Sequence, residues 1–309
     1  MSQFFLILWN VITPIFLLIG LGYLVQKRVG LDLKTLTRLN FWIFVPAFLF
    51  VHIYESKLSG AQLGQIALHF LVFFPLLGLV AWGAARLFGF HDRLRRALTA
   101  SVLFYNSGNY GVPVAQLAFP GAVLPLQVQA AIVMMQNITN FTLGLYLVAG
   151  GKGKRRREIL KEIARLPMIY VLVLAWTMRF FEIAPPKPLH DALHYLAGAL
   201  VPVAVVTLGA QMAGLKVPRF NRPLLVSLSL RLLFAPVLGF AVIVVLGITG
   251  PLASALLIST SFPTAVNSAL LALEYDNEPQ FAAAAVFYST LVSSATVSAV
   301  IYVAQKMLF

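Results

Sequence analysis

The chain has 309 residues, of which 60% are hydrophobic and only 11% are charged. Soluble domains carry about 25% charged residues, so this composition excludes an ordinary soluble protein and indicates an all-α polytopic membrane protein. The net charge of +13 does not indicate nucleic-acid binding, because the basic residues lie between apolar segments. Without cysteine the chain can form neither disulfides nor thiolate metal sites.

Ten apolar segments are long enough to cross a bilayer, since about 20 residues suffice. We predict them at residues 4–25, 36–54, 64–88, 95–118, 124–149, 164–183, 191–214, 223–247, 251–273 and 281–305. The first segment has no basic residue before Lys27 and no small-residue cleavage site after it. We therefore do not expect a secretory signal peptide.

The loops between these segments carry the basic residues unevenly. Most of the 23 Lys and Arg residues follow the first, third, fifth and seventh segments. Basic loops remain in the cytoplasm, so both termini are predicted to be extracytoplasmic in a multi-pass protein of the cell (inner) membrane.

A basic run, Gly150 to Arg157, divides the chain into halves of five segments. We expect a first repeat at 1–150, a basic cytoplasmic linker at 151–163 that fixes topology, with anionic-lipid contact as a secondary role, and a second repeat at 164–309. An odd number of crossings inverts the second repeat. Pro46 and Pro202 occupy matching segments of the two halves.

The fourth segment is interrupted by the run Asn106-Ser-Gly-Asn-Tyr-Gly-Val-Pro113, and the ninth by Ser261-Phe-Pro263-Thr264. Unpaired backbone groups cost several kcal/mol in hydrocarbon, and paired broken helices mark the substrate site of secondary transporters. We predict crossovers built by Gly108, Gly111, Pro113 and Pro263, with both prolines in the first turn of the following half-helix.

The half-helix N-termini would attract an anion. Candidate substrate-binding residues are Asn106, Ser107, Asn109, Tyr110, Pro113, Ser261, Pro263, Thr264 and Asn267, together with Gln136, Asn137 and Asn140 in the fifth segment. The alternative is that the polar side chains only cap the breaks and join helices, which explains the fifth-segment residues equally well.

Charged residues within the segments are few. None of the ten acidic residues lies at mid-membrane, so we do not expect ion coupling; Glu274, at the end of the ninth segment, is the nearest candidate. Arg231 lies within the eighth segment, where we expect it to snorkel or to bind a backbone carbonyl rather than substrate.

The sequence His190-Asp-Ala-Leu-His194 is similar to the zinc motif H-E-x-x-H, but Asp replaces the general base and no third ligand is evident. We expect the start of an outer-surface helix here. No metal or cofactor is predicted.

The run from Asn106 to Pro113 resembles the fourth-segment crossover of the auxin efflux carrier family, which includes the plant PIN-formed carriers. The stretch Ser261 to Pro279 resembles its ninth-segment crossover, and Asn40 and Pro46 fit its second segment. The resemblance implies ten helices in inverted repeats, related to bile-acid sodium symporters. It also implies a scaffold of segments 1, 2, 6 and 7 and a moving unit of segments 3–5 and 8–10.

By the same resemblance, Asn106 would hydrogen-bond the substrate carboxylate, and bacterial relatives include proposed malonate carriers. The short central loop, and Thr264 where plant carriers tend to have glutamine, favour a bacterial member over an auxin carrier.

These observations predict a secondary transporter that moves small organic anions by an elevator-type alternating access, with little or no ion coupling. A sodium- or proton-coupled symporter is the alternative, and transport that collapses without sodium would favour it. An intramembrane enzyme lacks a paired nucleophile and base, and crossovers that block a straight pore disfavour a channel. The sequence leaves a homodimer open.

Overall fold

The computed structural model describes residues 3–148, 164, 166–215 and 220–307, so the predicted basic linker at 151–163 lies outside the described residues. All regular elements in these ranges are helices, as predicted, and there is one isolated antiparallel bridge.

The first half contains α1 (Gln3–Ile7), η1 (Leu8–Ile12), α2 (Thr13–Val29), α3 (Leu33–Leu39), η2 (Asn40–Phe44), α4 (Val45–Tyr54), α5 (Gly60–Leu87), α6 (Asp92–Leu103), η3 (Ser107–Gly111), α7 (Val112–Ala118), α8 (Leu124–Thr139), η4 (Asn140–Gly144) and α9 (Leu145–Val148). The second contains α11 (Pro167–Phe180), α12 (Lys187–Gly214), α13 (Arg222–Ser229), η5 (Leu230–Phe234), α14 (Ala235–Val245), α15 (Gly250–Ser259), α16 (Val266–Glu274) and α17 (Pro279–Met307). The elements labelled η are single π-helical turns.

Seven continuous helical segments among the described residues are long and apolar enough to cross a membrane. They cover 3–29, 33–54, 60–87, 124–148, 187–214, 222–245 and 279–306. The apolar helices α11 and α15 are shorter. The predicted fourth and ninth segments are each split into two short helices, α6 and α7 in one case and α15 and α16 in the other.

Prolines explain most of the π-helical turns. In the described residues, η1, η2, η3 and η5 each end two residues before a proline, namely Pro14, Pro46, Pro113 and Pro236. A proline inside a helix lacks the N–H donor and its ring clashes with the carbonyl four residues earlier. A wider π turn accommodates the displaced carbonyl, and such turns often occur at functional sites.

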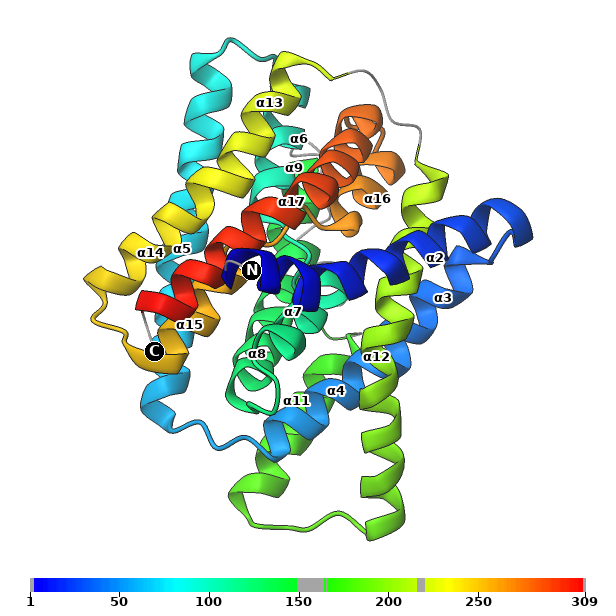
Figure 1. The fold of residues 1–309 in the computed structure, drawn as a ribbon, viewed down its shortest axis with the longest axis vertical. Helices are drawn as coiled ribbons and strands as arrows, with labels where there is room; N and C mark the ends of the chain where they lie inside the picture. Colours follow the sequence, from blue (N-terminus) through cyan, green and yellow to red (C-terminus); the bar gives the residue numbers. More distant parts are fainter. Residues whose placement is uncertain (1–2, 149–163, 165, 216–219, 308–309) are drawn as a thin grey trace.

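The helices form two packing groups (Figure 1). In the first group, α2 and α12 pack on each other and α4 packs on both α11 and α12. The α2–α12 contact is backbone on backbone. A Cβ on Gly209 would lie 1.9 Å from the carbonyl oxygen of Ile19, and one on Gly22 would lie 2.1 Å from that of Val206. Small residues permit such an approach between apolar helices.

The second group contains α5–α9 and α13–α17. Within it α5 packs on α6 and α14, and α15 packs on α8 and α17. The groups meet where α12 contacts η3 and where α4 contacts α8. The predicted crossovers therefore lie beside the boundary between the two groups.

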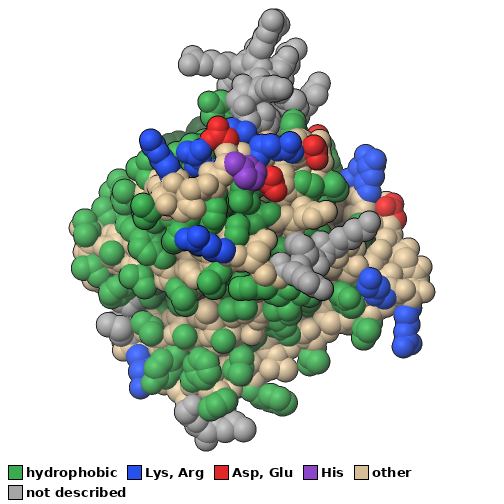
Figure 2. Space-filling model, turned by 90° about the horizontal axis from the view of Figure 1, so that it is seen from above, with side chains coloured by type: hydrophobic (Ala, Val, Ile, Leu, Met, Phe, Trp, Pro, Cys, Tyr) green, Lys and Arg blue, Asp and Glu red, His purple; other side chains and the backbone are tan. Residues whose placement is uncertain are grey.

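One end of the molecule carries clustered charges. Figure 2 views this end and shows Lys and Arg side chains beside acidic side chains and a histidine, next to largely hydrophobic surface. Among the charged residues of the structure, Arg93 near the start of α6 pairs with Asp276, and His91 lies 3.8 Å from Glu278. These contacts join the start of α6 to the α16–α17 turn.

Candidate functional site

The two broken helices cross each other through their backbones. Tyr105 and Thr264 form the antiparallel bridge. The amide of Asn106 donates to the carbonyl of Pro263 at 2.7 Å, and the amide of Ala265 donates to that of Phe104 at 2.8 Å. Each break thus satisfies backbone groups that the other leaves unpaired, which a membrane interior requires.

Side chains fix this crossing. The Thr264 hydroxyl donates to the carbonyl of Ser101 at 2.8 Å, and the Thr264 amide donates to the hydroxyl of Ser289 at 3.0 Å. Phe262 packs against Tyr110 with 6.1 Å between ring centroids, and a Cβ on Gly111 would lie 2.5 Å from the Phe262 ring. Gly111 therefore provides the space that Phe262 occupies.

The prolines do not both have the predicted position. Pro113 lies in the first turn of α7, but η3 precedes α7 without interruption, so the half-helix begins at Ser107 with Asn106 as its N-cap. Pro263 lies in the break itself, before α16 begins at Val266. The prediction for Pro263 was wrong: this residue precedes Ala265, the N-cap of α16, and its carbonyl accepts a hydrogen bond from the amide of Asn106.

Arg231 contacts the C-terminal ends of the two helices that precede the breaks, α6 and α15. It is fully buried, and its guanidinium donates to the carbonyl of Val102 at 2.8 Å and to that of Thr260. It also lies 4.8 Å from the centroid of the Tyr105 ring. The last carbonyls of a helix carry partial negative charge, so a cation is stabilised there. The expected carbonyl interaction of Arg231 is confirmed.

A cavity of about 100 Å³ lies beside the crossing, between the two packing groups. It is lined by eight residues singled out from the sequence: Asn106, Ser107, Gly108, Asn109, Gln136, Asn137, Asn140 and Asn267. Four further polar residues complete the polar part of the lining: Thr37, Asn40, Thr207 and Gln211. The rest of the lining is apolar or aromatic: Phe41, Val45, Phe104, Tyr105, Val133, Ala265 and Val266. No charged side chain is found in this described lining.

Five predicted substrate-binding residues do not line the cavity. Tyr110, Pro113, Ser261, Pro263 and Thr264 are all buried in the crossing. Tyr110 accepts a hydrogen bond from Ser293 at 3.0 Å, and the Ser261 hydroxyl donates to the carbonyl of Ile258 at 2.6 Å. The contacts of these five residues match the alternative interpretation, in which polar side chains cap the breaks and join helices without binding substrate.

The Asn106 side-chain amide has one atom in a hydrogen bond and one atom without a hydrogen-bond partner among the described residues. Its Oδ1 accepts from the backbone N–H of Asn109 at 3.1 Å. A backbone N–H can only donate, so this bond fixes the orientation of the amide. Its Nδ2 is buried and has no hydrogen-bond partner among the described residues. Asn106 therefore caps the half-helix and also presents an unused N–H donor pair.

Two cavity-lining amides face hydroxyls across the boundary. Asn40 Nδ2 lies 3.3 Å from the Thr207 hydroxyl, and Gln211 Nε2 lies 3.1 Å from the Thr37 hydroxyl. In each amide the carbonyl oxygen is buried with no partner in the described part of the chain. The Thr37 hydroxyl already donates to the carbonyl of Leu33 at 2.7 Å, so it can only accept from Gln211, and the free Gln211 Oε1 is an acceptor for a ligand. The Thr207 hydroxyl can donate or accept, so Asn40 can offer a ligand either an acceptor or a donor.

Sequence reasoning missed three of the four polar residues that the first packing group contributes to the lining. Thr37, Thr207 and Gln211 were not singled out, and Asn40 entered only through the family resemblance. Thr207 and Gln211 are four residues apart on α12 and share one helix face. A polar stripe within an otherwise apolar segment is a signal that could have identified them.

A second cavity of about 260 Å³ adjoins the first and shares Thr37, Phe41, Asn140 and Asn267 with it. Its lining includes Arg38 and Glu274. Glu274 is the last residue of α16, so the end of this helix places a carboxylate in the lining of the second cavity.

Long apolar helices around a buried polar cavity at a helix crossing define a membrane transport protein. Residues 153–302 match the sequence profile of the family described as "Membrane transport protein". The chain is similar to this auxin efflux carrier-like family of transporters, as its motifs predicted, and the names of the family and of the relatives below indicate a transporter rather than an enzyme.

Relatives match along almost the whole chain. An "Uncharacterized transporter" of Methanothermobacter thermautotrophicus is 29% identical over 294 residues, covering 91% of this chain and 93% of the relative. A "Putative malonate transporter" of Rhizobium meliloti is 26% identical over 315 residues, covering 96% of each. An uncharacterized transporter of Methanocaldococcus jannaschii is 25% identical over 297 residues, covering 92% of this chain and 94% of the relative.

Proposed function

We propose that this protein is a secondary transporter of small organic anions, with dicarboxylates of malonate size as the first candidates. The observation that carries the proposal is the buried, unpaired Nδ2 of Asn106 beside a cavity without acidic lining residues in the part of the chain described. A buried donor without a partner is costly, and a carboxylate oxygen would satisfy it with a charge-assisted hydrogen bond.

Electrostatics support an anion rather than a cation. Arg231 is fully buried, and no carboxylate pairs with it among the described residues. Its guanidinium lies against the Tyr105 ring, and Tyr105 lines the cavity. The start of η3 contributes the partial positive charge of a helix N-terminus on the same side. A negative ligand would therefore be attracted without a charged side chain in direct contact.

The cavity size supports a small ligand. A single water needs about 10–15 Å³ of such volume, so about 100 Å³ accommodates several waters or a small dicarboxylate. The name of the Rhizobium relative makes malonate the first compound to test.

We propose ten membrane crossings in two inverted repeats, with elevator-type movement. The split pairs α6/α7 and α15/α16 occupy equivalent places in the two halves, which supports the repeat. The two packing groups correspond to a scaffold (α1–α4, α11, α12) and a moving unit (α5–α9, α13–α17). A substrate held mainly by the second group, against α12 of the first, would move with that group.

We further propose that both termini are extracytoplasmic in the inner membrane. In Figure 1 the α2–α3 and α5–α6 connections lie toward the upper right and the top, whereas the α4–α5, α11–α12 and α14–α15 connections lie toward the bottom and left. The helix ends beside the first two connections carry the basic residues, with Lys27, Arg28 and Lys34 at the first and Arg86 and Arg93 at the second, which supports a cytoplasmic location for them.

Coupling to a sodium or proton gradient is the second candidate. The position of Glu274 in the lining of the second cavity, which shares four lining residues with the first, favours it. The lack of a carboxylate in the described lining of the first cavity favours transport driven by the membrane potential alone.

Thermal stabilisation by carboxylates tests the proposal directly. A ligand that binds only the folded state raises its stability by RT ln(1 + [L]/Kd), about 2.7 kcal/mol at one hundred times Kd. We expect malonate or another small dicarboxylate to raise the melting temperature of purified protein and to be accumulated by proteoliposomes. Matched neutral diamides should do neither. If no carboxylate in a broad panel stabilises the protein, the proposed substrate class is wrong.

A further inference from the structure

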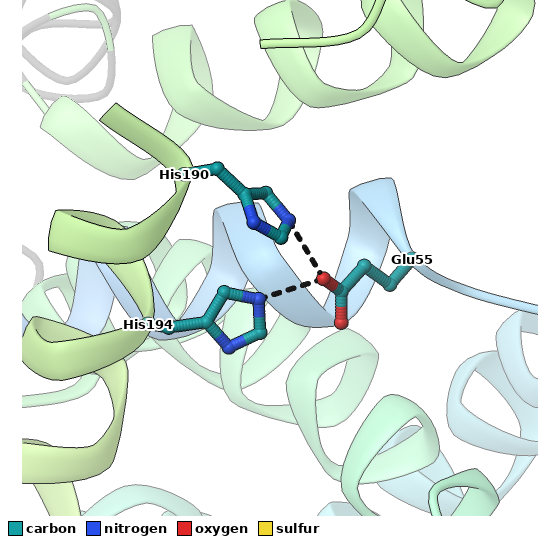
Figure 3. A group of neighbouring side chains, drawn as sticks. All are labelled: Glu55, His190 and His194. Carbon is teal, nitrogen blue, oxygen red and sulfur yellow. Dashed lines mark hydrogen bonds and ion pairs between the residues drawn. The ribbon is translucent and has the colours of Figure 1, made fainter. Parts of the chain in front are cut away.

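We propose that Glu55, His190 and His194 form a binding site for a zinc-class divalent cation, away from the crossing. This site does not depend on the proposed transport substrate. The cluster lies where the C-terminal end of α4 meets the first turns of α12, two elements of the first packing group (Figure 3).

The three ligand atoms already converge. His190 Nε2 lies 2.9 Å and His194 Nε2 lies 2.7 Å from the same carboxylate oxygen, Oε1 of Glu55. The three atoms lie within 4.8 Å of one another. His190 and His194 are four residues apart on α12, so they project from one helix face, the spacing by which helices supply two imidazoles to zinc. The sequence offered no third ligand because Glu55 lies 135 residues before His190.

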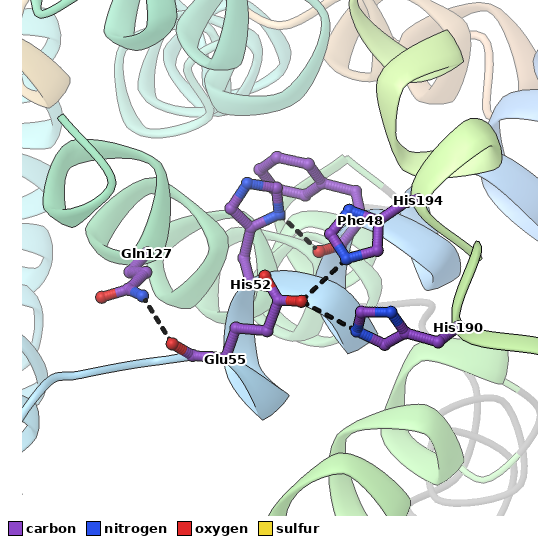
Figure 4. A network of polar contacts seen from close by, with 6 residues as sticks. All are labelled: Phe48, His52, Glu55, Gln127, His190 and His194. Atoms are coloured by element: carbon purple, nitrogen blue, oxygen red, sulfur yellow. Dashed lines mark hydrogen bonds and ion pairs between the residues drawn. The ribbon is translucent and has the colours of Figure 1, made fainter. Parts of the chain in front are cut away.

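Neighbouring contacts hold Glu55 in place without using its carboxylate. Gln127 of α8 donates from Nε2 to the Glu55 carbonyl at 3.2 Å (Figure 4). Its Oε1 accepts from the Lys57 amide at 3.3 Å. The Tyr54 ring contacts the His190 ring edge-on, with centroids 6.5 Å apart. These contacts position the backbone of Glu55, while its carboxylate oxygen Oε1 contacts both imidazole nitrogens, which a cation would take over as ligands together with that oxygen.

The ligand set selects the kind of metal. Two imidazoles and one carboxylate suit zinc and other first-row metals, whereas calcium and magnesium prefer oxygen ligands. Zinc bonds of about 2.0–2.2 Å in tetrahedral geometry place ligand atoms about 3.3 Å apart. The Glu55 oxygen would move about half an ångström away from each imidazole nitrogen, and the two imidazole nitrogens, which lie within 4.8 Å of each other, would adjust to the same spacing.

The site has an open side. A cavity of about 400 Å³ is lined by Glu55 and His194 and by the nearby His52. Water from this cavity can complete a three-ligand zinc site, as in open zinc centres. Glu55 begins the connection from α4 to α5, which joins the two packing groups. Bound metal would tether this connection to α12.

Zinc titration of tag-free, chelator-treated protein tests the site. We expect about one equivalent of zinc to bind by calorimetry and to raise the melting temperature, with weaker binding at acidic pH because imidazole ligands must be unprotonated. Glu55→Gln, His190→Gln and His194→Gln should each weaken binding at least tenfold. Cobalt bound in place of zinc should give visible absorption bands that the same variants remove.

Asp191→Asn is the matched control, since Asp191 is on the same helix but pairs with Lys187 at 2.6 Å instead. It should bind zinc as the wild type does. Unchanged zinc binding by the Glu55→Gln/His190→Gln/His194→Gln triple variant, or no binding by the wild type, overturns the proposal. In the triple variant, stabilisation by a carboxylate substrate should persist, so the two proposals fail independently.

Discussion

Substitutions of Asn106 separate its two roles, because its two amide atoms have different partners. Asn106→Ala removes the Oδ1 that caps η3 and the free Nδ2 together. Asn106→Asp keeps an acceptor for the Asn109 N–H, and Asp is a good N-cap, but it replaces the donor by a negative charge. In Asn106→Asp the cap of the half-helix is kept, but the proposed attraction between an N–H donor and the ligand carboxylate becomes a repulsion between two carboxylates.

The magnitudes differ accordingly. A hydrogen bond to a charged group contributes about 1.5–3 kcal/mol, so Asn106→Ala should raise the Kd for a carboxylate about ten- to a hundredfold. Loss of the cap should also destabilise the protein by about 1 kcal/mol. In Asn106→Asp, like charges about 4 Å apart at an effective dielectric constant of 20 cost about 4 kcal/mol. This should abolish measurable binding with little loss of stability.

The assay is calorimetric or thermal-shift titration of purified variants, followed by uptake into proteoliposomes. Asn137→Ala is the control, because Asn137 lines the same cavity but its Nδ2 already donates to the carbonyl of Val133 at 2.9 Å. We expect less than a threefold effect there. If Asn106→Asp binds and transports the anion as the wild type does, the crossing is a structural device and the substrate site lies elsewhere.

Three further outcomes follow from the packing, the topology and the charges. Gly209→Ala should destabilise the protein by about 1–3 kcal/mol through overpacking, which would be seen as a lower melting temperature. Gly20→Ala is the control and should be neutral, because no atom lies within 4 Å of the added Cβ. Equal effects of the two substitutions would contradict the close α2–α12 contact. Single cysteines replacing Arg93 and Lys187, in this cysteine-free chain, should react with impermeant reagents from opposite sides of the membrane, and labelling of both from one side would exclude the proposed orientation. Anion flux should persist without a sodium or proton gradient and should respond to membrane potential, worth about 2.3 kcal/mol per charge per 100 mV; flux that requires a gradient and is lost in Glu274→Gln would instead establish coupling.

The sequence by itself determined the class of protein and the location of both breaks. Long apolar stretches must become helices in a membrane, since only internal hydrogen bonds satisfy the backbone there. Glycines and prolines mark the two interrupted stretches. The structure breaks the first between Leu103 and Ser107, just before Gly108, and the second around Pro263, whereas Gly111 and Pro113 lie inside the helix that follows the first break. The local chemistry of glycine and proline was sufficient for this prediction.

Tertiary structure decided which polar side chains face a cavity. Thr264 and Asn267 are three residues apart and look equivalent in sequence. Thr264 is bound to Ser101 and Ser289, whereas Asn267 lines the cavity. The difference arises because Thr264 forms the bridge with Tyr105 of the other break and bonds to residues distant in sequence, and no local pattern specifies these partners.

Long-range packing likewise assembled what no single segment contains. Arg231 reaches the carbonyl ends of two half-helices from separate halves of the chain, and Glu55 meets His190 and His194 across 135 and 139 residues. Hydrophobic periodicity fixes each helix and its apolar face, but it does not fix the pairing between helices. That pairing arises from close backbone contacts such as Gly22 with Val206 and from hydrogen bonds that two distant breaks can satisfy only in each other.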